Sequence, residues 1–104
     1  MPSACAVALV LLLDASGSVS AADWRMQVRG TADGVADEAI GRIIERHTAA
    51  GAAVAMTAIA FSDMTVPVVP WRILTSAAQA EDFAGALRAT PRALHGGTRI
   101  GKAI

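Results

Sequence analysis

The fold is decided by residues 7–18, which read VALVLLLDASGS. Val7–Leu13 is an unbroken apolar run of strand length, and it ends at Asp14 in a short stretch of small polar residues. A strand that is apolar on both faces is typical of a parallel sheet covered by helices. We therefore expect a buried strand at residues 7–13, followed by a loop at the carboxyl end of the sheet.

Length and composition allow one small domain. The chain has 104 residues, with 9 basic and 9 acidic side chains and no basic cluster. This balance argues against nucleic acid or an anionic membrane surface as the main partner. The chain is 54% hydrophobic, but 24 of its residues are alanine, which buries little area and leaves a thin core. The single cysteine, Cys5, excludes an internal disulfide and a cysteine-based zinc site.

The N-terminal apolar run also has an alternative interpretation. Residues 4–13 resemble the apolar part of a signal peptide, and Val19-Ser20-Ala21 would serve as its cleavage site. No basic residue precedes the run, however, and Asp14 follows it directly. The run is also shorter than the roughly 20 apolar residues that span a bilayer, so no transmembrane segment is expected.

A long helical pattern follows the loop. Ser20 is a plausible N-cap and Gly51 a plausible stop. Between them, seven residues recur at intervals of three or four and predict one helix with a buried stripe: Trp24, Val28, Thr31, Val35, Ala39, Ile43 and His47. The three glycines within this pattern lower helix propensity, which suggests a close approach of the helix to the sheet: Gly30, Gly34 and Gly41.

Two further strands and a second helix are expected. Residues 54–61 and 65–69 have the composition of strands, and the short connection Ser62-Asp63-Met64 permits only an antiparallel hairpin. Pro67 and Pro70 assign the second of these strands to a sheet edge. Ser76 then begins a helix with Gln79 as its capping-box partner, and Phe83 and Leu87 share its buried face. Strands alternating with helices predict the α/β class.

The segment Asp14-x-Ser16-x-Ser18 carries the strongest chemical signal. It lies at the carboxyl end of the most apolar strand, where open α/β sheets bind their ligands. One carboxylate and two hydroxyls are hard oxygen ligands, which suit Mg²⁺, Mn²⁺ or Ca²⁺ and suit zinc or copper poorly. Gly17 would let the backbone turn so that the three side chains converge. The alternative is a loop that only caps the next helix through Ser18 or Ser20.

These residues resemble the metal-ion-dependent adhesion site of von Willebrand factor A-type domains. The resemblance continues through Ile59-Ala60-Phe61-Ser62, which is similar to the second strand of those domains. It extends to residues 96–104, GGTRIGKAI, which resemble the loop that supplies their threonine ligand. More narrowly, Val68-Val69-Pro70-Trp71 and the Gly-Thr-x-Ile-Gly segment are similar to an uncharacterised bacterial family within that superfamily.

The resemblance implies a truncated Rossmann-like von Willebrand A fold, with about three strands, two helices and the start of a third. Residues 1–104 would form a single partial domain that lacks its C-terminal half, including the aspartate that supplies the last ligand. Asp63 is more simply a hairpin-turn residue than a replacement for it. In the sheet order of those domains, strand 7–13 would have an unpaired edge, which predicts self-association or poor solubility.

By position, the resemblance assigns the metal ligands to Asp14, Ser16, Ser18 and Thr98, with Mg²⁺ as the first choice and Mn²⁺ or Ca²⁺ as alternatives. The implied function is a binding module, without catalytic residues, whose cation accepts an Asp or Glu of a protein partner. Its bacterial relatives look exported, although no convincing signal peptide is present here. Two other hypotheses remain open. The chain is either a small phosphohydrolase or phosphotransferase with Asp14 as nucleophile, or a fragment with neither activity.

Overall fold

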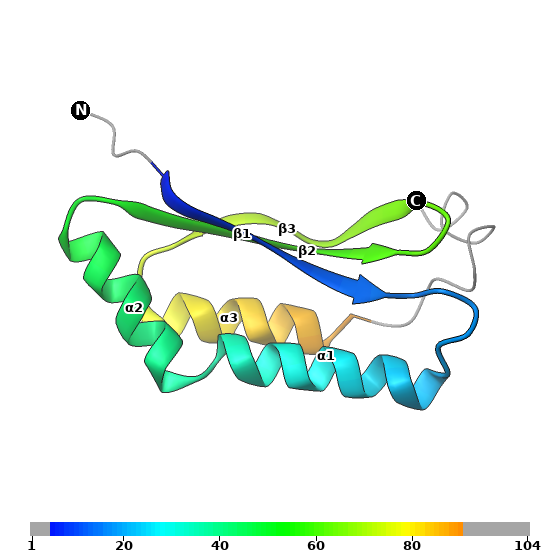
Figure 1. Cartoon of the computed structure of the whole chain (residues 1–104). Coiled ribbons are helices and arrows are strands. Elements are labelled where there is room, and N and C mark those ends of the chain that lie inside the picture. Colours follow the sequence, from blue (N-terminus) through cyan, green and yellow to red (C-terminus); the bar gives the residue numbers. More distant parts are fainter. Residues whose placement is uncertain (1–4, 91–104) are drawn as a thin grey trace.

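A computed structural model describes residues 5–90 of the chain (Figure 1). The chain combines three strands with three helices, and the predicted α/β class is confirmed. The expected threonine loop and the helix start at residues 96–104 lie outside the described residues. The elements, in chain order, are β1 (Cys5–Asp14), α1 (Ala21–Val35), α2 (Glu38–Ala49), β2 (Ala53–Phe61), β3 (Thr65–Leu74) and α3 (Ala77–Arg88).

The three strands form one mixed sheet in the order β1-β2-β3. β1 pairs with β2 in parallel, so that Leu13 lies opposite Ala60. β2 and β3 form the expected antiparallel hairpin around residues 62–64, with two register shifts along the ladder. Pro67 and Pro70 are exposed in β3 at one edge of the sheet, as predicted. At the opposite edge, β1 has no second neighbour among the described strands.

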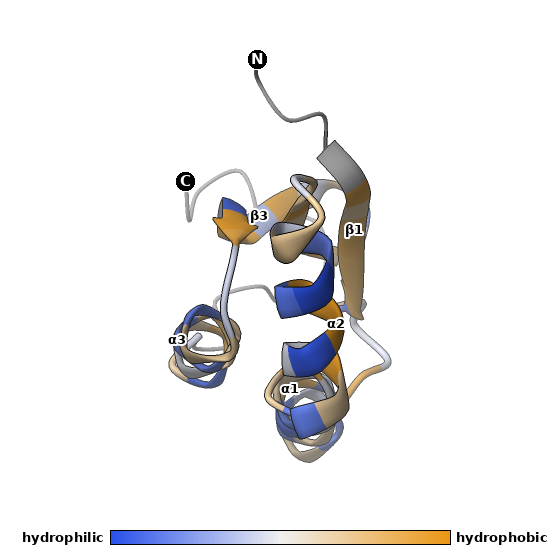
Figure 2. Ribbon diagram, turned by 90° about the vertical axis from the view of Figure 1, so that its left-hand side faces the viewer, coloured by the Kyte–Doolittle hydropathy of each residue, from blue (hydrophilic) through white to orange (hydrophobic). Residues whose placement is uncertain are grey.

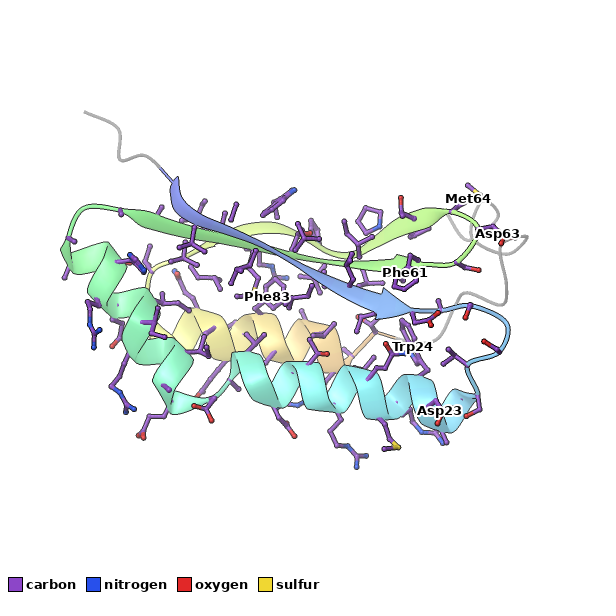
Figure 3. All side chains as sticks on the ribbon, viewed as in Figure 1. Asp23, Trp24, Phe61, Asp63, Met64 and Phe83 are labelled. Carbon is purple, nitrogen blue, oxygen red and sulfur yellow. The ribbon has the colours of Figure 1, made fainter. Side chains whose placement is uncertain are left out.

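All three helices lie on the same side of the sheet (Figures 1 and 2). Phe83 of α3 is fully buried between the layers, as Figure 3 shows, and Leu87 lies beside it in the same core, as its position four residues later predicts. Trp24 of α1 is 2% exposed and belongs to this core. Many of the side chains that the sheet contributes to the core are small, for example Ala58 and Ala60. The core is therefore thin, as the alanine content indicates.

The single helix predicted between residues 20 and 51 is wrong, because the structure has two helices there. α1 ends at Val35, and Asp37 caps α2 by accepting a hydrogen bond from the backbone N–H of Ala39 at 2.8 Å. The break changes the phase of the apolar stripe. Ile44 is therefore buried in α2, whereas Ile43, which the uninterrupted stripe would place inside, is 45% exposed.

The predicted helix caps are largely confirmed. The Ser20 hydroxyl accepts a hydrogen bond from the backbone N–H of Asp23, and Gly51 follows the end of α2 with a positive φ of 84°. Ser76 likewise accepts from the N–H of Gln79. The other half of the expected capping box differs, because the Gln79 side chain accepts from the backbone N–H and hydroxyl of Thr75.

The expected approach of helical glycines to the sheet is not observed. Gly41 packs against α3 instead, where an added Cβ would lie 2.7 Å from the Cβ of Ala77. An added Cβ at Gly30 or Gly34 would meet no atom within 4 Å. Only Gly41 of the three therefore allows a close contact within the described fold, and that contact joins two helices.

The sheet face opposite the helices is apolar and carries no helix among residues 5–90. Val10 and Leu12 of β1 are 46% and 63% exposed there, and Trp71 and Ile73 of β3 are 54% and 56% exposed. Trp71 therefore does not belong to the core of the described residues. Figure 2 shows the apolar character of β1 along most of its length. Within the same range, no helix is long and apolar enough to cross a membrane.

Candidate functional site

The candidate site is the loop between β1 and α1, and its base belongs to the sheet. Asp14 is the last residue of β1, opposite Phe61 at the end of β2. The next residue, Ala15, is fully buried, and its backbone N–H donates to the carbonyl oxygen of Phe61 at 2.8 Å. The loop therefore leaves the carboxyl end of the sheet from a fixed point, as the sequence predicts for a ligand-binding loop.

The side chain of Gln27 fixes the loop from the other side. Its Oε1 accepts a hydrogen bond from the backbone N–H of Asp14 at 2.9 Å, and its Nε2 donates to the carbonyl oxygen of Asp14 at 2.8 Å. A neighbouring β-strand would form hydrogen bonds with the same backbone N–H and carbonyl groups of Asp14. The side-chain amide of Gln27 therefore takes the place of a strand partner for the last residue of β1. Sequence reasoning missed Gln27, because no local pattern distinguishes it from any other polar residue of a helix.

Asp14 and Ser16 are linked within the loop. The backbone N–H of Ser16 donates to Oδ1 of Asp14 at 2.9 Å, and the backbone N–H of Val19 donates to the carbonyl oxygen of Ser16 at 3.0 Å. The hydroxyls of Ser16 and Ser18 lie 3.3 Å apart. The structure therefore brings three of the four predicted ligand residues, Asp14, Ser16 and Ser18, into one turn.

The expected role of Gly17 is not observed, because the convergence needs no left-handed backbone at that position. Gly51 is the one glycine with positive φ among the described residues. An added Cβ at Gly17 would also meet no atom within 4 Å. The turn that joins Ser16 to Ser18 is therefore open to any small residue at position 17.

The carboxyl group of Asp14 is stabilised in its charged form. Hydrogen bonds from the backbone N–H and the side chain of Ser16 lower its pKa below the ordinary value, and the small effect of desolvation acts in the opposite direction. An ionised carboxylate beside two neutral hydroxyls is a donor set for a hard divalent cation.

The spacing of the two hydroxyls is compatible with such a cation. Two ligands at a right angle on an octahedral Mg²⁺ lie about 2.8–3.0 Å apart, because each Mg–O distance is about 2.0–2.1 Å. The longer Ca–O distances of about 2.3–2.6 Å give about 3.3–3.7 Å in the same arrangement. The observed 3.3 Å, at which the two hydroxyls are hydrogen-bonded to each other, lies at the lower end of the calcium range and a few tenths of an ångström above the magnesium range. The residues present therefore fit a divalent cation.

The remaining predicted residues lie elsewhere. Thr98 falls outside the described residues. Asp63 is exposed at the tip of the β2–β3 hairpin, in agreement with a turn role, and Figure 3 shows it beyond the end of the sheet. His47 is half-buried in α2. Across residues 5–90, no three His, Cys, Asp or Glu side chains form a cluster that could hold a metal by themselves.

A cavity between α1 and the end of α3 is separate from this loop. It has a volume of about 580 Å³. Its lining includes Trp24 and the ion pair between Arg88 and Asp33, whose atoms approach to 2.8 Å, but neither Asp14 nor either loop serine. The loop is therefore a surface site at the sheet edge rather than an enclosed pocket.

Fold and loop together define an α/β protein with a carboxylate-and-hydroxyl turn at the carboxyl end of a parallel strand pair. Residues 4–104 match the family described as a protein of unknown function (DUF1194), and the chain belongs to that family. An uncharacterised family is what the resemblance indicated. No curated protein and no solved structure matches the chain.

Proposed function

We propose that the loop of Asp14, Ser16 and Ser18 holds a divalent cation, Mg²⁺ in the first place, and that this cation binds an acidic side chain of a protein partner. The observation that carries the proposal is the 3.3 Å separation of the two serine hydroxyls beside the ionised carboxylate of Asp14. Thr98, which lies outside the described residues, is proposed as a further ligand on the resemblance to von Willebrand A-type domains alone.

The charge of the loop supports this type of binding. One carboxylate and neutral hydroxyls leave most of the charge of a divalent cation uncompensated. A carboxylate from outside would restore neutrality, so the site favours an Asp or Glu of a partner. The cation supplies electrostatic attraction and an open coordination position. The chain supplies placement, since the sheet and Gln27 hold Asp14 from two sides.

Calorimetric titration of Mg²⁺ and Mn²⁺ into the full chain tests the cation site. We expect binding in the wild type and none in the double variant Asp14→Ala, Ser16→Ala. The matched control is Ser62→Ala, Asp63→Ala, which removes the same two residue types from the exposed hairpin. Equal heats in the wild type and the Asp14 double variant would refute the site.

A second measurement tests the partner. Peptides that contain Asp or Glu are compared with the same peptides carrying Asn or Gln, with and without Mg²⁺. We expect cation-dependent binding of the acidic members alone, and its loss in the Asp14 double variant. Hydrolysis of an aryl phosphate that requires both Asp14 and Mg²⁺ would instead favour the phosphohydrolase hypothesis.

A further inference from the structure

We propose that the cavity between α1 and the end of α3 binds an acidic peptide segment of a protein partner, with Arg25 and Arg29 as the groups that bind its carboxylates. The cavity has a volume of about 580 Å³, within the range of about 300–1,000 Å³ that is typical of ligand sites. The recognition of carboxylates does not depend on the cation. The choice of a protein partner as their source rests on the proposed function.

Apolar side chains of α1 form one wall of the cavity. Trp24 and Val28 are 2% and 6% exposed, and Figure 3 shows Trp24 on the sheet side of α1. The indole Nε1 of Trp24 is buried and donates no hydrogen bond within residues 5–90. A buried donor without an acceptor is unfavourable, and folded proteins contain few of them. A ligand with oxygen acceptors at this wall would accept that hydrogen bond.

Charged side chains form the rest of the lining. Among the described residues they are three arginines and one aspartate: Arg25, Arg29, Arg88 and Asp33. Arg88 donates to Asp33 at 2.8 Å, so these two charges offset each other. Arg25 and Arg29 have no ion pair within residues 5–90. The lining therefore has two positive charges that no described acid neutralises, and it complements a ligand with two negative charges.

The spacing of these two arginines matches an extended peptide. Four residues of an α-helix rise about 6 Å, which is the axial separation of Arg25 and Arg29. Side chains two residues apart on an extended chain are about 6.6–6.8 Å apart. Acidic residues at alternate positions of a peptide can therefore pair with the two arginines one to one. Each guanidinium can bind a carboxylate through two parallel hydrogen bonds.

The cavity lies close to the proposed cation loop in the chain. Ala21, the first residue of α1, lines the cavity, and Ser18 precedes it by three residues. Three residues span at most about 11 Å. A partner that binds the cation through one acidic side chain can therefore place further acidic residues in the cavity. This proximity favours a peptide of that partner over a free organic acid.

The chain that follows α3 does not complement the cavity by charge. Residues 91–104 come directly after Thr90, which lines the cavity, and they contain Arg92, Arg99 and Lys102 but no Asp or Glu. These side chains would add positive charge beside Arg25 and Arg29. An acidic segment from a partner therefore suits the lining better than this part of the chain does.

NMR titration of the full chain with two capped peptides tests the proposal. A chelator is present, so that the cation loop makes no contribution. The probes are acetyl-Glu-Leu-Glu-amide and its neutral counterpart acetyl-Gln-Leu-Gln-amide, each up to about 10 mM, a range that covers millimolar affinity. Trp71→Phe, at an exposed position, leaves Trp24 as the only tryptophan and so gives one indole N–H signal. We expect the acidic peptide alone to shift this signal in a saturable manner.

Two pairs of arginine substitutions test the role of the lining. Arg25→Gln with Arg29→Gln should weaken peptide binding at least about tenfold, because two charge-assisted contacts are lost. Arg42→Gln with Arg46→Gln is the matched control, since it removes two exposed arginines with the same spacing from α2 and should leave the affinity unchanged. An unshifted Trp24 signal, an equal response to both peptides, or equal losses in the two double variants would overturn the proposal.

The Asp14→Ala, Ser16→Ala variant separates this proposal from the cation site. With the chelator present, it should bind the acidic peptide as the wild type does. A wild type that binds no cation but responds to the acidic peptide at Trp24 would refute the cation loop alone. A wild type that binds the cation without any response at Trp24 to the peptide would refute the cavity alone.

Discussion

Replacing Gln27 by methionine removes both hydrogen bonds to the backbone of Asp14 while keeping a flexible side chain of similar length. A typical hydrogen bond contributes a net of about 0.5–1.5 kcal/mol, so the two bonds at 2.9 and 2.8 Å together contribute about 1–3 kcal/mol. Because Asp14 is only half-buried in the described fold, water can bind its freed backbone groups. We therefore expect the free energy of unfolding to fall by about 1–2 kcal/mol.

Urea denaturation measures this change, with Met26→Gln as the reciprocal control. Met26 is the neighbouring residue of α1 and is 71% exposed, so the opposite exchange at that position should alter stability by no more than about 0.5 kcal/mol. Hydrogen exchange at the amide of Asp14 should also become faster in Gln27→Met. If Gln27→Met and Met26→Gln unfold at the same urea concentration as the wild type, Gln27 does not hold the loop.

Two further predictions concern helix packing and the charge of the loop. Gly41→Ala should lower the free energy of unfolding by about 1–3 kcal/mol, because the added Cβ would overlap that of Ala77 at 2.7 Å. Gly85→Ala should raise it by about 0.5–1 kcal/mol, because its added Cβ would meet no atom within 4 Å and alanine favours a helix. Urea denaturation of both variants tests this difference. In the presence of a chelator, NMR titration should place the pKa of Asp14 below its ordinary value, and Ser16→Ala should raise it part of the way back. Since the folded pKa is the lower one, the stability from this carboxylate is present above the ordinary aspartate pKa and is lost as the pH falls through the lowered value; an unshifted pKa would contradict the loop geometry.

Local patterns predicted the parts of the fold that local physics determines. The apolar run before Asp14, the three-residue hairpin and the serine caps each depend on residues adjacent in sequence, and the structure contains all of them. The break between α1 and α2 could not be seen in the apolar pattern, because residues at intervals of three or four continue from Val35 to Ala39 across it. Asp37, an N-cap residue type directly before Glu38, was the signal that could have located it.

The environments of Trp71 and Gln27 could not be predicted for a different reason. Whether an aromatic residue on an edge strand is buried depends on a second layer over that sheet face, which no local pattern encodes. The contact between Gln27 and Asp14 spans thirteen residues and depends on how α1 lies against β1. The turn that brings together the carboxylate and the two hydroxyls could be predicted because these residues lie two apart in the sequence, but the residue that positions Asp14 could not.

Gln27 also links the loop to the packing of α1. Its amide completes the hydrogen bonding of Asp14 from within the same chain, so the position of the loop depends on how α1 lies against β1. Trp24 and Val28, which precede and follow Gln27 in α1, are buried in the core. A substitution in the core that moves α1 relative to the sheet should therefore displace Asp14 as well, although no residue of the loop has changed.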